Sequence, residues 1–295
     1  INNTITATGD YAYGIELQSS NTDNNQIVNN TVSNSGEYSR GILTQANADN
    51  NNISNNTVTA TGSNAIGIRV NSAAGTTIRD NYVNSTQDEG ISLASSTQLT
   101  AFRNNITSTG GNGPLYVNSV TDSTISSNTA RSTNVYATWL SALSGSSFIN
   151  NNILSTTTRG LFIDEVSSNN NISRNNVTSG SDYAVMLSNS TNNSLSYNII
   201  DGGQVGLEVD AKSNQNTIYE NSITGTNTAT YLENSYLNTF RRNSHVSPSV
   251  AIFFNAANYT NFTDCATVDG SPDVQVWTNA GAAENILLNC SYDTD

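Results

Sequence analysis

Carboxylates recur at one-repeat intervals in the second half of the chain. Asp164, Ser188, Asp210 and Glu233 occupy equivalent repeat positions, and Glu208 stands two residues before Asp210, on the same face of an extended strand. Two carboxylates on one face can serve as the acid and base of an inverting glycosidase if their separation is suitable. The same oxygens could bind calcium, or they could form a solvated surface on an acidic protein.

Other catalytic and metal-binding patterns are missing from the sequence. His245 is the single histidine, and without cysteine or histidine partners it does not make a metal site. It stands where other repeats carry Ile or Val, so we expect it to be partly packed at a strand end. We therefore predict no catalytic residue, no metal centre and no cofactor, with calcium at the acidic residues as the open possibility.

Large apolar residues form a second periodic row, at a position that strand alternation places on the outside. The row includes Tyr116, Trp139, Phe162, Met186, Tyr231 and Phe253. Large apolar side chains that point out of a soluble protein need an explanation. Three explanations remain open: an assembly interface, a glycan stacked on the rings, or coverage by the chain's own loops.

Two short repeated elements must position these rows. The first reads apolar-x-x-Asn-x-apolar, as in Ile27 to Val32 and Ile53 to Val58. Stacked asparagine amides can donate and accept hydrogen bonds along a solenoid axis, and asparagine tolerates the left-handed backbone of a sharp turn. Its fourth position holds Asn3, Asn30, Asn56, Asn81, Asn104, Asn128, Asn151, Asn175, Asn198, Asn221, Asn243 and Asn289, with Cys265 as the exception.

The second element reads Gly or Ala, apolar, any residue, apolar. Examples are Gly67 to Val70, Gly160 to Ile163 and Gly206 to Val209. Its second and fourth positions alternate with an outward third position, as in a strand buried on one face. Short strands at a fixed period, without a helical pattern, predict the coils of a β-solenoid.

The Ile-x-Asn-Asn-Thr-Val and Gly-Ile-x-Leu copies resemble the parallel β-helix repeats of the NosD-like and the carbohydrate-binding and sugar-hydrolase families. The resemblance covers essentially the whole chain and implies an all-β, right-handed parallel β-helix of about 12 coils of 22–27 residues with an internal asparagine ladder. Such repeats are abundant in surface proteins, and members include polysaccharide lyases, hydrolases and epimerases. The paired-Asp, Gly-His-Gly and Arg-x-Lys motifs of the polygalacturonase-like members do not occur in this sequence.

We predict a single domain over residues 1–295 that begins inside a repeat and has modified C-terminal coils over 246–295. Cys265 and Cys290 are one repeat apart in this region, so they should be neighbours in space. A disulfide between the last two coils is favoured over two packed free thiols, and it would suit an oxidising compartment.

Composition limits the partners and the location. The chain has 49 Asn, 40 Ser and 37 Thr, and its net charge of −13 argues against nucleic-acid binding. No apolar run is long enough for a transmembrane helix, so we predict no membrane insertion in this span. We predict an extracellular or cell-surface location, with Asn84, Asn189 and Asn258 as candidate glycosylation sites in expected turns.

Our first hypothesis for function is a structural module that assembles with itself or with another surface protein through the apolar row, and that is not an enzyme. The alternative is a carbohydrate-binding or polysaccharide-processing solenoid that uses the same row with Asp164, Asp210 and Glu233.

Overall fold

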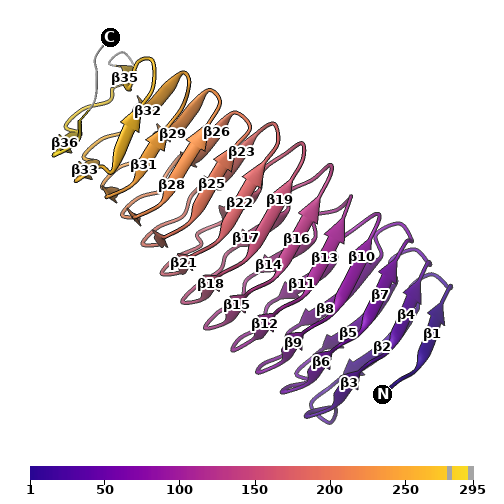
Figure 1. The fold of residues 1–295 in the computed structure, drawn as a ribbon. Helices are drawn as coiled ribbons and strands as arrows, with labels where there is room; N and C mark the ends of the chain where they lie inside the picture. Colours follow the sequence, from indigo (N-terminus) through magenta and orange to yellow (C-terminus); the bar gives the residue numbers. More distant parts are fainter. Residues whose placement is uncertain (278–280, 292–295) are drawn as a thin grey trace.

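The chain winds into a solenoid with three parallel sheets on its sides (Figure 1). The computed structural model describes residues 1–277 and 281–291. Each sheet has 12 strands, and each coil adds one strand to each sheet. The described residues contain no helix, and hence none that could span a membrane. The predicted all-β solenoid of about 12 coils is confirmed.

Sheet A carries the second half of the first repeated element. Its strands, in order, are β1 (Thr4–Ala7), β4 (Thr31–Asn34), β7 (Thr57–Ala60), β10 (Tyr82–Ser85), β13 (Asn105–Ser108), β16 (Thr129–Ser132), β19 (Asn152–Ser155), β22 (Asn176–Ser179), β25 (Ile199–Gly202), β28 (Ser222–Gly225), β31 (Ser244–Val246) and β34 (Thr267–Asp269).

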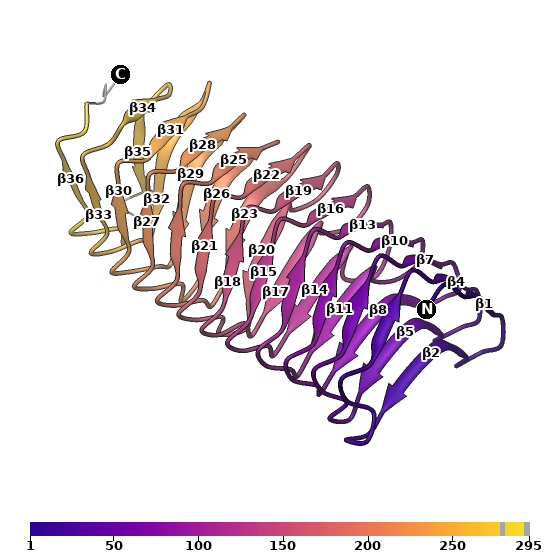
Figure 2. The ribbon, with the colours of Figure 1, turned by 60° about the horizontal axis from the view of Figure 1, so that its bottom comes forward.

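Sheet B carries the second repeated element, and its strands lie side by side along the whole solenoid (Figure 2). They are β2 (Tyr13–Gln18), β5 (Arg40–Gln45), β8 (Ile66–Asn71), β11 (Ile91–Ala94), β14 (Leu115–Asn118), β17 (Thr138–Ser141), β20 (Leu161–Asp164), β23 (Tyr183–Leu187), β26 (Val205–Val209), β29 (Thr228–Glu233), β32 (Val250–Asn255) and β35 (Val274–Trp277).

Sheet C carries the first half of the first repeated element. Its strands are β3 (Gln26–Val28), β6 (Asn52–Ser54), β9 (Thr77–Arg79), β12 (Thr100–Phe102), β15 (Thr124–Ser126), β18 (Ser147–Ile149), β21 (Asn171–Ser173), β24 (Ser194–Ser196), β27 (Thr217–Tyr219), β30 (Thr239–Arg241), β33 (Asn261–Thr263) and β36 (Ile286–Leu288).

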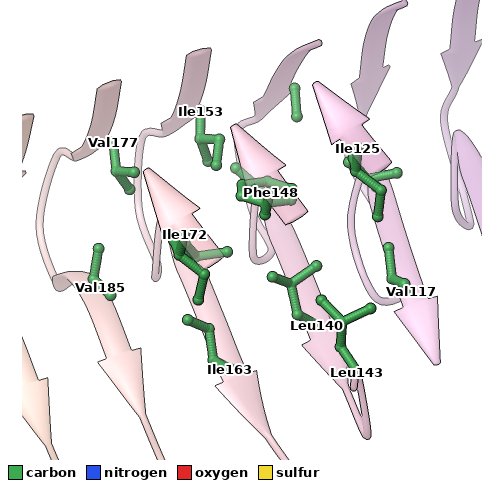
Figure 3. Packing of buried hydrophobic residues seen from close by; sticks show 14 of the residues in the cluster. Val117, Ile125, Leu140, Leu143, Phe148, Ile153, Ile163, Ile172, Val177 and Val185 are labelled. Atoms are coloured by element: carbon green, nitrogen blue, oxygen red, sulfur yellow. The ribbon is translucent and has the colours of Figure 1, made fainter. Parts of the chain in front are cut away.

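The interior is one continuous apolar column, because the inward position of each strand stacks on the same position one coil away (Figure 3). In one coil, for example, Leu140 of sheet B, Phe148 of sheet C and Ile153 of sheet A all point inward and are almost fully buried. Each coil therefore buries little by itself and gains its core from its neighbours. This packed interior leaves binding to the outside of the solenoid.

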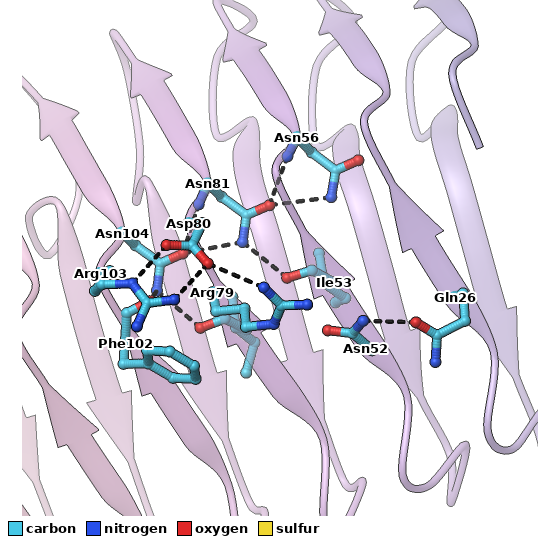
Figure 4. A network of polar contacts seen from close by, with 11 residues as sticks. Gln26, Asn52, Ile53, Asn56, Arg79, Asp80, Asn81, Phe102, Arg103 and Asn104 are labelled. Atoms are coloured by element: carbon cyan, nitrogen blue, oxygen red, sulfur yellow. Dashed lines mark hydrogen bonds and ion pairs between the residues drawn. The ribbon is translucent and has the colours of Figure 1, made fainter.

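Buried asparagines hold the corner between sheets C and A (Figure 4). The Nδ2 of Asn56 donates to Oδ1 of Asn81 at 3.0 Å, and the Nδ2 of Asn81 donates to Oδ1 of Asn104 at 2.9 Å. Backbone N–H groups of the same residues donate to the same oxygens, so the ladder satisfies polar groups that would otherwise be buried without partners. The pattern continues from Asn3 to Asn243 as predicted.

One detail of the predicted ladder is wrong. The left-handed residue of the turn is the one before the ladder asparagine, as at Asn29 with φ 57° and Asp80 with φ 56°. The asparagine is thus selected by its amide rather than by its backbone conformation. The buried amide makes the hydrogen bonds of the corner. The left-handed position before it accepts other residue types, as Arg103 with φ 54° before Asn104 shows.

The predicted ladder position of Asn289 is also wrong. Phe262 pairs with Leu287 and Thr263 with Leu288, so Cys290, not Asn289, lies in register with Cys265. The amide ladder ends at Asn243, and the two cysteines occupy the next two positions as a disulfide. This lies in the C-terminal region 246–295, which is described over 246–277 and 281–291.

A second, shorter asparagine ladder lines the corner between sheets B and C and was not predicted. The Nδ2 of Asn170 donates to Oδ1 of Asn193 at 3.0 Å, and the same contact links Asn193 to Asn216 and Asn216 to Asn238. Its members precede those of the first ladder by five residues, as Asn170 precedes Asn175. Serines replace them in the middle coils, where the Oγ of Ser146 accepts from the backbone of Ser123.

Candidate functional site

The outer face of sheet B carries the row of large side chains. In-register pairing links Tyr116 to Trp139, Trp139 to Phe162 and Phe162 to Met186. We call the full set of in-register residues the central row. In chain order it contains Glu16, Leu43, Arg69, Ser92, Tyr116, Trp139, Phe162, Met186, Glu208, Tyr231, Phe253 and Gln275.

The rings of the central row touch one another. The ring centroids of Tyr116 and Trp139 are 5.3 Å apart, and those of Trp139 and Phe162 are 5.6 Å apart. Further along, the rings of Tyr231 and Phe253 are 5.2 Å apart. These are ordinary aromatic contact distances, and they turn separate side chains into two apolar platforms on one face.

A flanking row of side chains covers part of this apolar surface. The guanidinium of Arg159 lies over the ring of Phe162 at 4.7 Å and near the rings of Tyr136 and Tyr183 at 5.4 and 5.6 Å. Phe162, which lies under this guanidinium, is only 9% exposed, and its neighbour Met186 is 7% exposed. Short turns join the described strands of this region, so side-chain neighbours rather than long loops give the coverage.

The two aromatic platforms at either side of Met186 and Glu208 remain accessible. Tyr116 and Trp139 in one platform, and Tyr231 and Phe253 in the other, are half-buried. Their polar groups are oriented by neighbours: the Nδ2 of Asn118 donates to the hydroxyl oxygen of Tyr116 at 2.8 Å. Rings fixed in this way present flat faces at low conformational cost.

Trp139 also connects the aromatic residues to the acidic ones. Its indole N–H donates to Oδ1 of Asp164 at 2.7 Å, and partial burial is the main cause that raises the pKa of this carboxyl group. The adjacent Glu165 is exposed and accepts from the hydroxyl of Ser141 at 2.6 Å. Asp164 is therefore engaged in holding the Trp139 ring.

Three of the predicted acidic residues come together. Asp210 directly follows β26, and Glu233 is the last residue of β29. One carboxylate oxygen from each of Glu208, Asp210 and Glu233 lies within 4.8 Å of the other two. Asp164 is not a member of this group. The carboxylates of the trio lie closer together than the roughly 6.5–9.5 Å that an inverting glycosidase needs.

Glu208 is the least expected member, because it belongs to the central row and is only 4% exposed. Its Oε2 has no hydrogen-bond partner among the described residues. Burial, and then the charge of Asp210, raise the pKa of Glu208 to about 8, although Arg159 acts in the opposite direction. Burial and the charge of Glu208 in turn help to raise the pKa of Tyr183 to about 12.

Glu233 is oriented by the next coil. The Nδ2 of Asn255 donates to Oε1 of Glu233 and to the hydroxyl oxygen of Tyr231, both at 2.8 Å. Asn255 therefore ties the acidic trio to the second aromatic platform, and the trio is bounded by half-buried rings on this side.

Sequence reasoning missed a pocket on the N-terminal part of the same face. A cavity of about 350 Å³ is lined by Arg40, Arg69 and Glu89 together with Tyr116, the first ring of the platform. Glu89 is 4% exposed and accepts from the Nδ2 of Asn112 at 2.5 Å, and burial raises its pKa to about 7. The sequence contained one indication of this pocket. Glu89 stands directly before Gly90, the first residue of a repeated strand element, where a charged side chain is unexpected because the strand is buried.

His245 lies in the solenoid interior, which corrects the prediction of a partly packed residue. It is fully buried, pairs in register with Ile223 and Val268, and packs beside Phe240 and Phe262. Its Nδ1 lies 2.7 Å from the hydroxyl of Thr230, and desolvation lowers its pKa to about 3.

The candidate glycosylation sites differ in setting. Asn189 lies in an exposed turn with φ 47°. Asn84, expected in a turn, lies instead in β10, where its Oδ1 accepts from the hydroxyl of Thr107 at 2.9 Å. Asn258 is half-buried, and its Oδ1 accepts from the backbone N–H of Ala283 at 2.6 Å.

The family model "Right handed beta helix region" matches residues 1–130, 67–223 and 142–292. The chain belongs to this family. The stacked parallel sheets and the repeat sequences thus both indicate a right-handed β-helix. The resemblance to the NosD-like subfamily remains a prediction. No curated protein matches the chain.

Solved structures of other β-helices are similar in fold. The A-module of the Azotobacter vinelandii mannuronan C-5 epimerase AlgE4 has a TM-score of 0.65 at 12% identity, with 98% of this chain and 86% of that chain covered. The Dettilon tailspike protein gp208 has a TM-score of 0.63 at 15% identity, covering 94% and 60%. The periplasmic alginate epimerase AlgG has a TM-score of 0.51 at 13% identity, covering 98% and 77%.

Proposed function

We propose that this β-helix binds an extended glycan chain along the outer face of sheet B. The observation that carries the proposal is the central row itself. Its two aromatic platforms are half-buried, held by side-chain hydrogen bonds and aligned along the solenoid axis. Sugar rings stack on flat aromatic faces, and a linear polymer can extend along a row whose members repeat at every coil.

The polar residues around the platforms suit a polyhydroxylated ligand. Arg69, Glu89 and Asn118 lie beside Tyr116 around the N-terminal cavity, whereas Asp210 and Glu233 lie beside the second platform. Ligand sites combine apolar surface with a few placed polar groups in this manner. Of the similar folds, one is named as a mannuronan C-5 epimerase, one as an alginate epimerase and one as a tailspike protein, which supports a polysaccharide ligand.

The contribution of the row to binding can be measured directly. Isothermal titration against a panel of neutral and acidic polysaccharides should show binding for the wild-type chain and a loss of at least about tenfold for Trp139→Ala. Tyr82→Ala is the matched control, because Tyr82 is 48% exposed on the strand β10 of sheet A, away from the row. Thermal melts of both variants report whether the fold persists.

The competing hypothesis of self-assembly gives a different result. If the row is an interface between copies, light scattering should show association that rises with concentration and disappears in Trp139→Ala. Association of this kind, together with no binding to any glycan of the panel, would overturn the glycan proposal. Processing activity is measured in the same panel by following new reducing ends, new double bonds or inverted sugar centres.

A further inference from the structure

The acidic trio differs from an ordinary acidic surface in one respect. Surface carboxylates are usually solvated, but Glu208 is 4% exposed and its Oε2 lacks a partner among the described residues. A buried carboxylate without compensation is costly, and such a group is normally paired or bound to a metal ion. The structure therefore leaves a buried acceptor that a ligand would satisfy.

No ion pair among the described residues supplies this compensation. Of the four ion pairs among the described residues, none includes Glu208, Asp210 or Glu233. Arg159 is the positive group that affects Glu208, and its guanidinium lies over the rings of Phe162 and Tyr183. The three carboxyl groups thus place several acidic oxygens in a small volume without an ion-pair partner.

We propose that Glu208, Asp210 and Glu233 bind a divalent cation of the calcium type on the outer face of sheet B. One ligand oxygen from each residue lies within 4.8 Å of the other two, so an ion between them can reach all three with small side-chain adjustments. Calcium accepts six to eight oxygen ligands at roughly 2.3–2.6 Å, and three carboxylates supply up to six oxygens, with water completing the shell.

The donor set selects the kind of metal. The trio offers oxygen ligands alone, and the chain's single histidine, His245, is buried in the interior, so zinc and copper lack the nitrogen or sulfur ligands that they prefer. Magnesium keeps most of its water and commonly takes one or two carboxylates, whereas three carboxylates suit the larger calcium ion with its higher coordination number. The expected affinity is that of extracellular calcium modules, with Kd on the order of 10⁻⁴ to 10⁻³ M.

The rigid framework favours preorganisation of this site. Glu208 lies in β26, Asp210 directly follows this strand, and Glu233 is the last residue of β29. The pairing of Val209 with Leu232 therefore sets the backbone positions of the three residues one coil apart. Asn255 holds Oε1 of Glu233, which limits that side chain further. The site needs no segment to move into place.

Calcium binding can be tested without any glycan, so its failure is distinct from failure of the proposed glycan function. Isothermal titration of the chain with CaCl₂ should give one saturable site, and terbium emission sensitised by Tyr231, which pairs in register with Glu208, should report the same site. Asp210→Asn and Glu233→Gln should each weaken calcium binding by at least about tenfold, because ligand charge sets affinity. Both residues are only partly buried, so these variants are expected to fold.

Glu16→Gln is the matched control, because Glu16 belongs to the same row in the first coil and lies outside the trio. It should bind calcium as the wild type does. The wild-type melting temperature should rise with added calcium, and this rise should be lost in Asp210→Asn. No saturable binding at millimolar calcium, or unchanged affinity in Asp210→Asn, would overturn the proposal.

Discussion

Trp139 donates its indole N–H to a carboxylate oxygen of Asp164, 2.7 Å away on the next coil. This bond joins the aromatic and the acidic features of the outer face, because it fixes the ring that is central to the first platform. Asp164 thereby acts on the platform through Trp139 rather than as a member of the acidic trio.

The first prediction concerns this bond. Asp164→Ala should lower the free energy of unfolding by about 1 kcal/mol and weaken glycan binding severalfold, because the half-buried indole loses its acceptor. Asp164→Asn keeps an acceptor oxygen and should retain most of the affinity. Equal losses in both variants, measured by titration with the same glycan, would show that the charge rather than the hydrogen bond matters.

The second prediction is that the free energy of unfolding depends on pH through Glu208. Its pKa is about 8 in the folded chain and its ordinary value is 4.5, so the folded state binds the proton more tightly. Stability from this group is therefore complete below pH 4.5 and is lost as the pH rises toward 8. The groups that face it are Arg159, Asp182, Tyr183, Asp210, Tyr231 and Glu233.

Glu208→Gln should remove this loss. Without divalent cations at pH 8, the variant should be more stable than the wild type by on the order of 4 kcal/mol, and the two should converge near pH 4. Urea unfolding in EDTA at both pH values measures the difference. Added calcium should narrow the gap by stabilising the wild type alone, and a gap that is independent of pH would contradict the assignment.

His245 should make the free energy of unfolding fall as the pH is lowered, which is the opposite of the effect of Glu208. Its pKa falls from 6.5 to about 3 on burial, so the unfolded state binds a proton first as the pH drops. Stability from this group is lost from pH 6.5 downward toward pH 3. The double variant His245→Ile, Thr230→Val lacks this titrating group. The difference in free energy of unfolding between the variant and the wild type should therefore be larger at pH 4 than at pH 7, in favour of the variant, by on the order of 3 kcal/mol.

The double variant is chosen because Thr230 would otherwise lose its partner inside the core, and because Ile223 stands at the same position one coil earlier. Acid unfolding followed by circular dichroism reports the change. Ile223→Val serves as a control for altered packing, and it should shift stability equally at both pH values.

A single ladder asparagine should carry a large share of local stability. Asn128→Ala removes the acceptor for the backbone N–H and Nδ2 of Asn104, and the donor to Asn151. Loss of several buried hydrogen bonds should cost about 3 kcal/mol in urea unfolding. Asn134→Ala, in an exposed turn, should change stability by less than about 0.5 kcal/mol.

The disulfide predicts where the C-terminal coils lose stability. Replacing Cys265 and Cys290 by alanine should cost about 3 kcal/mol of local stability, read by hydrogen exchange in β33 and β36. Replacing both by asparagine should cost less, because the amides would stack on Asn243 and extend the ladder. Equal costs would show that these coils cannot accept the ladder geometry.

The sequence by itself determined the repeat, the sheets and most of the register. Inward residues and ladder asparagines recur at one-coil spacing, and stacking makes each coil repeat the environment of its neighbour, so local pattern and global fold coincide. The register in the last coil went wrong because Asn289 and Cys290 are adjacent in the chain. Only the pairing of Phe262 with Leu287 shows which of them occupies the ladder position.

The tertiary structure decided which outward residues act together and how deeply they are buried. The pattern placed Phe162 and Glu208 on an outer face, but Arg159 and the rings around it come from another row and cover that face in part. Glu89 and Arg40 join Tyr116 around one cavity although they belong to different coils. The burial of these side chains and the pKa values of the carboxyl groups depend on contacts between neighbouring rows. The repeat pattern of the sequence does not specify these contacts.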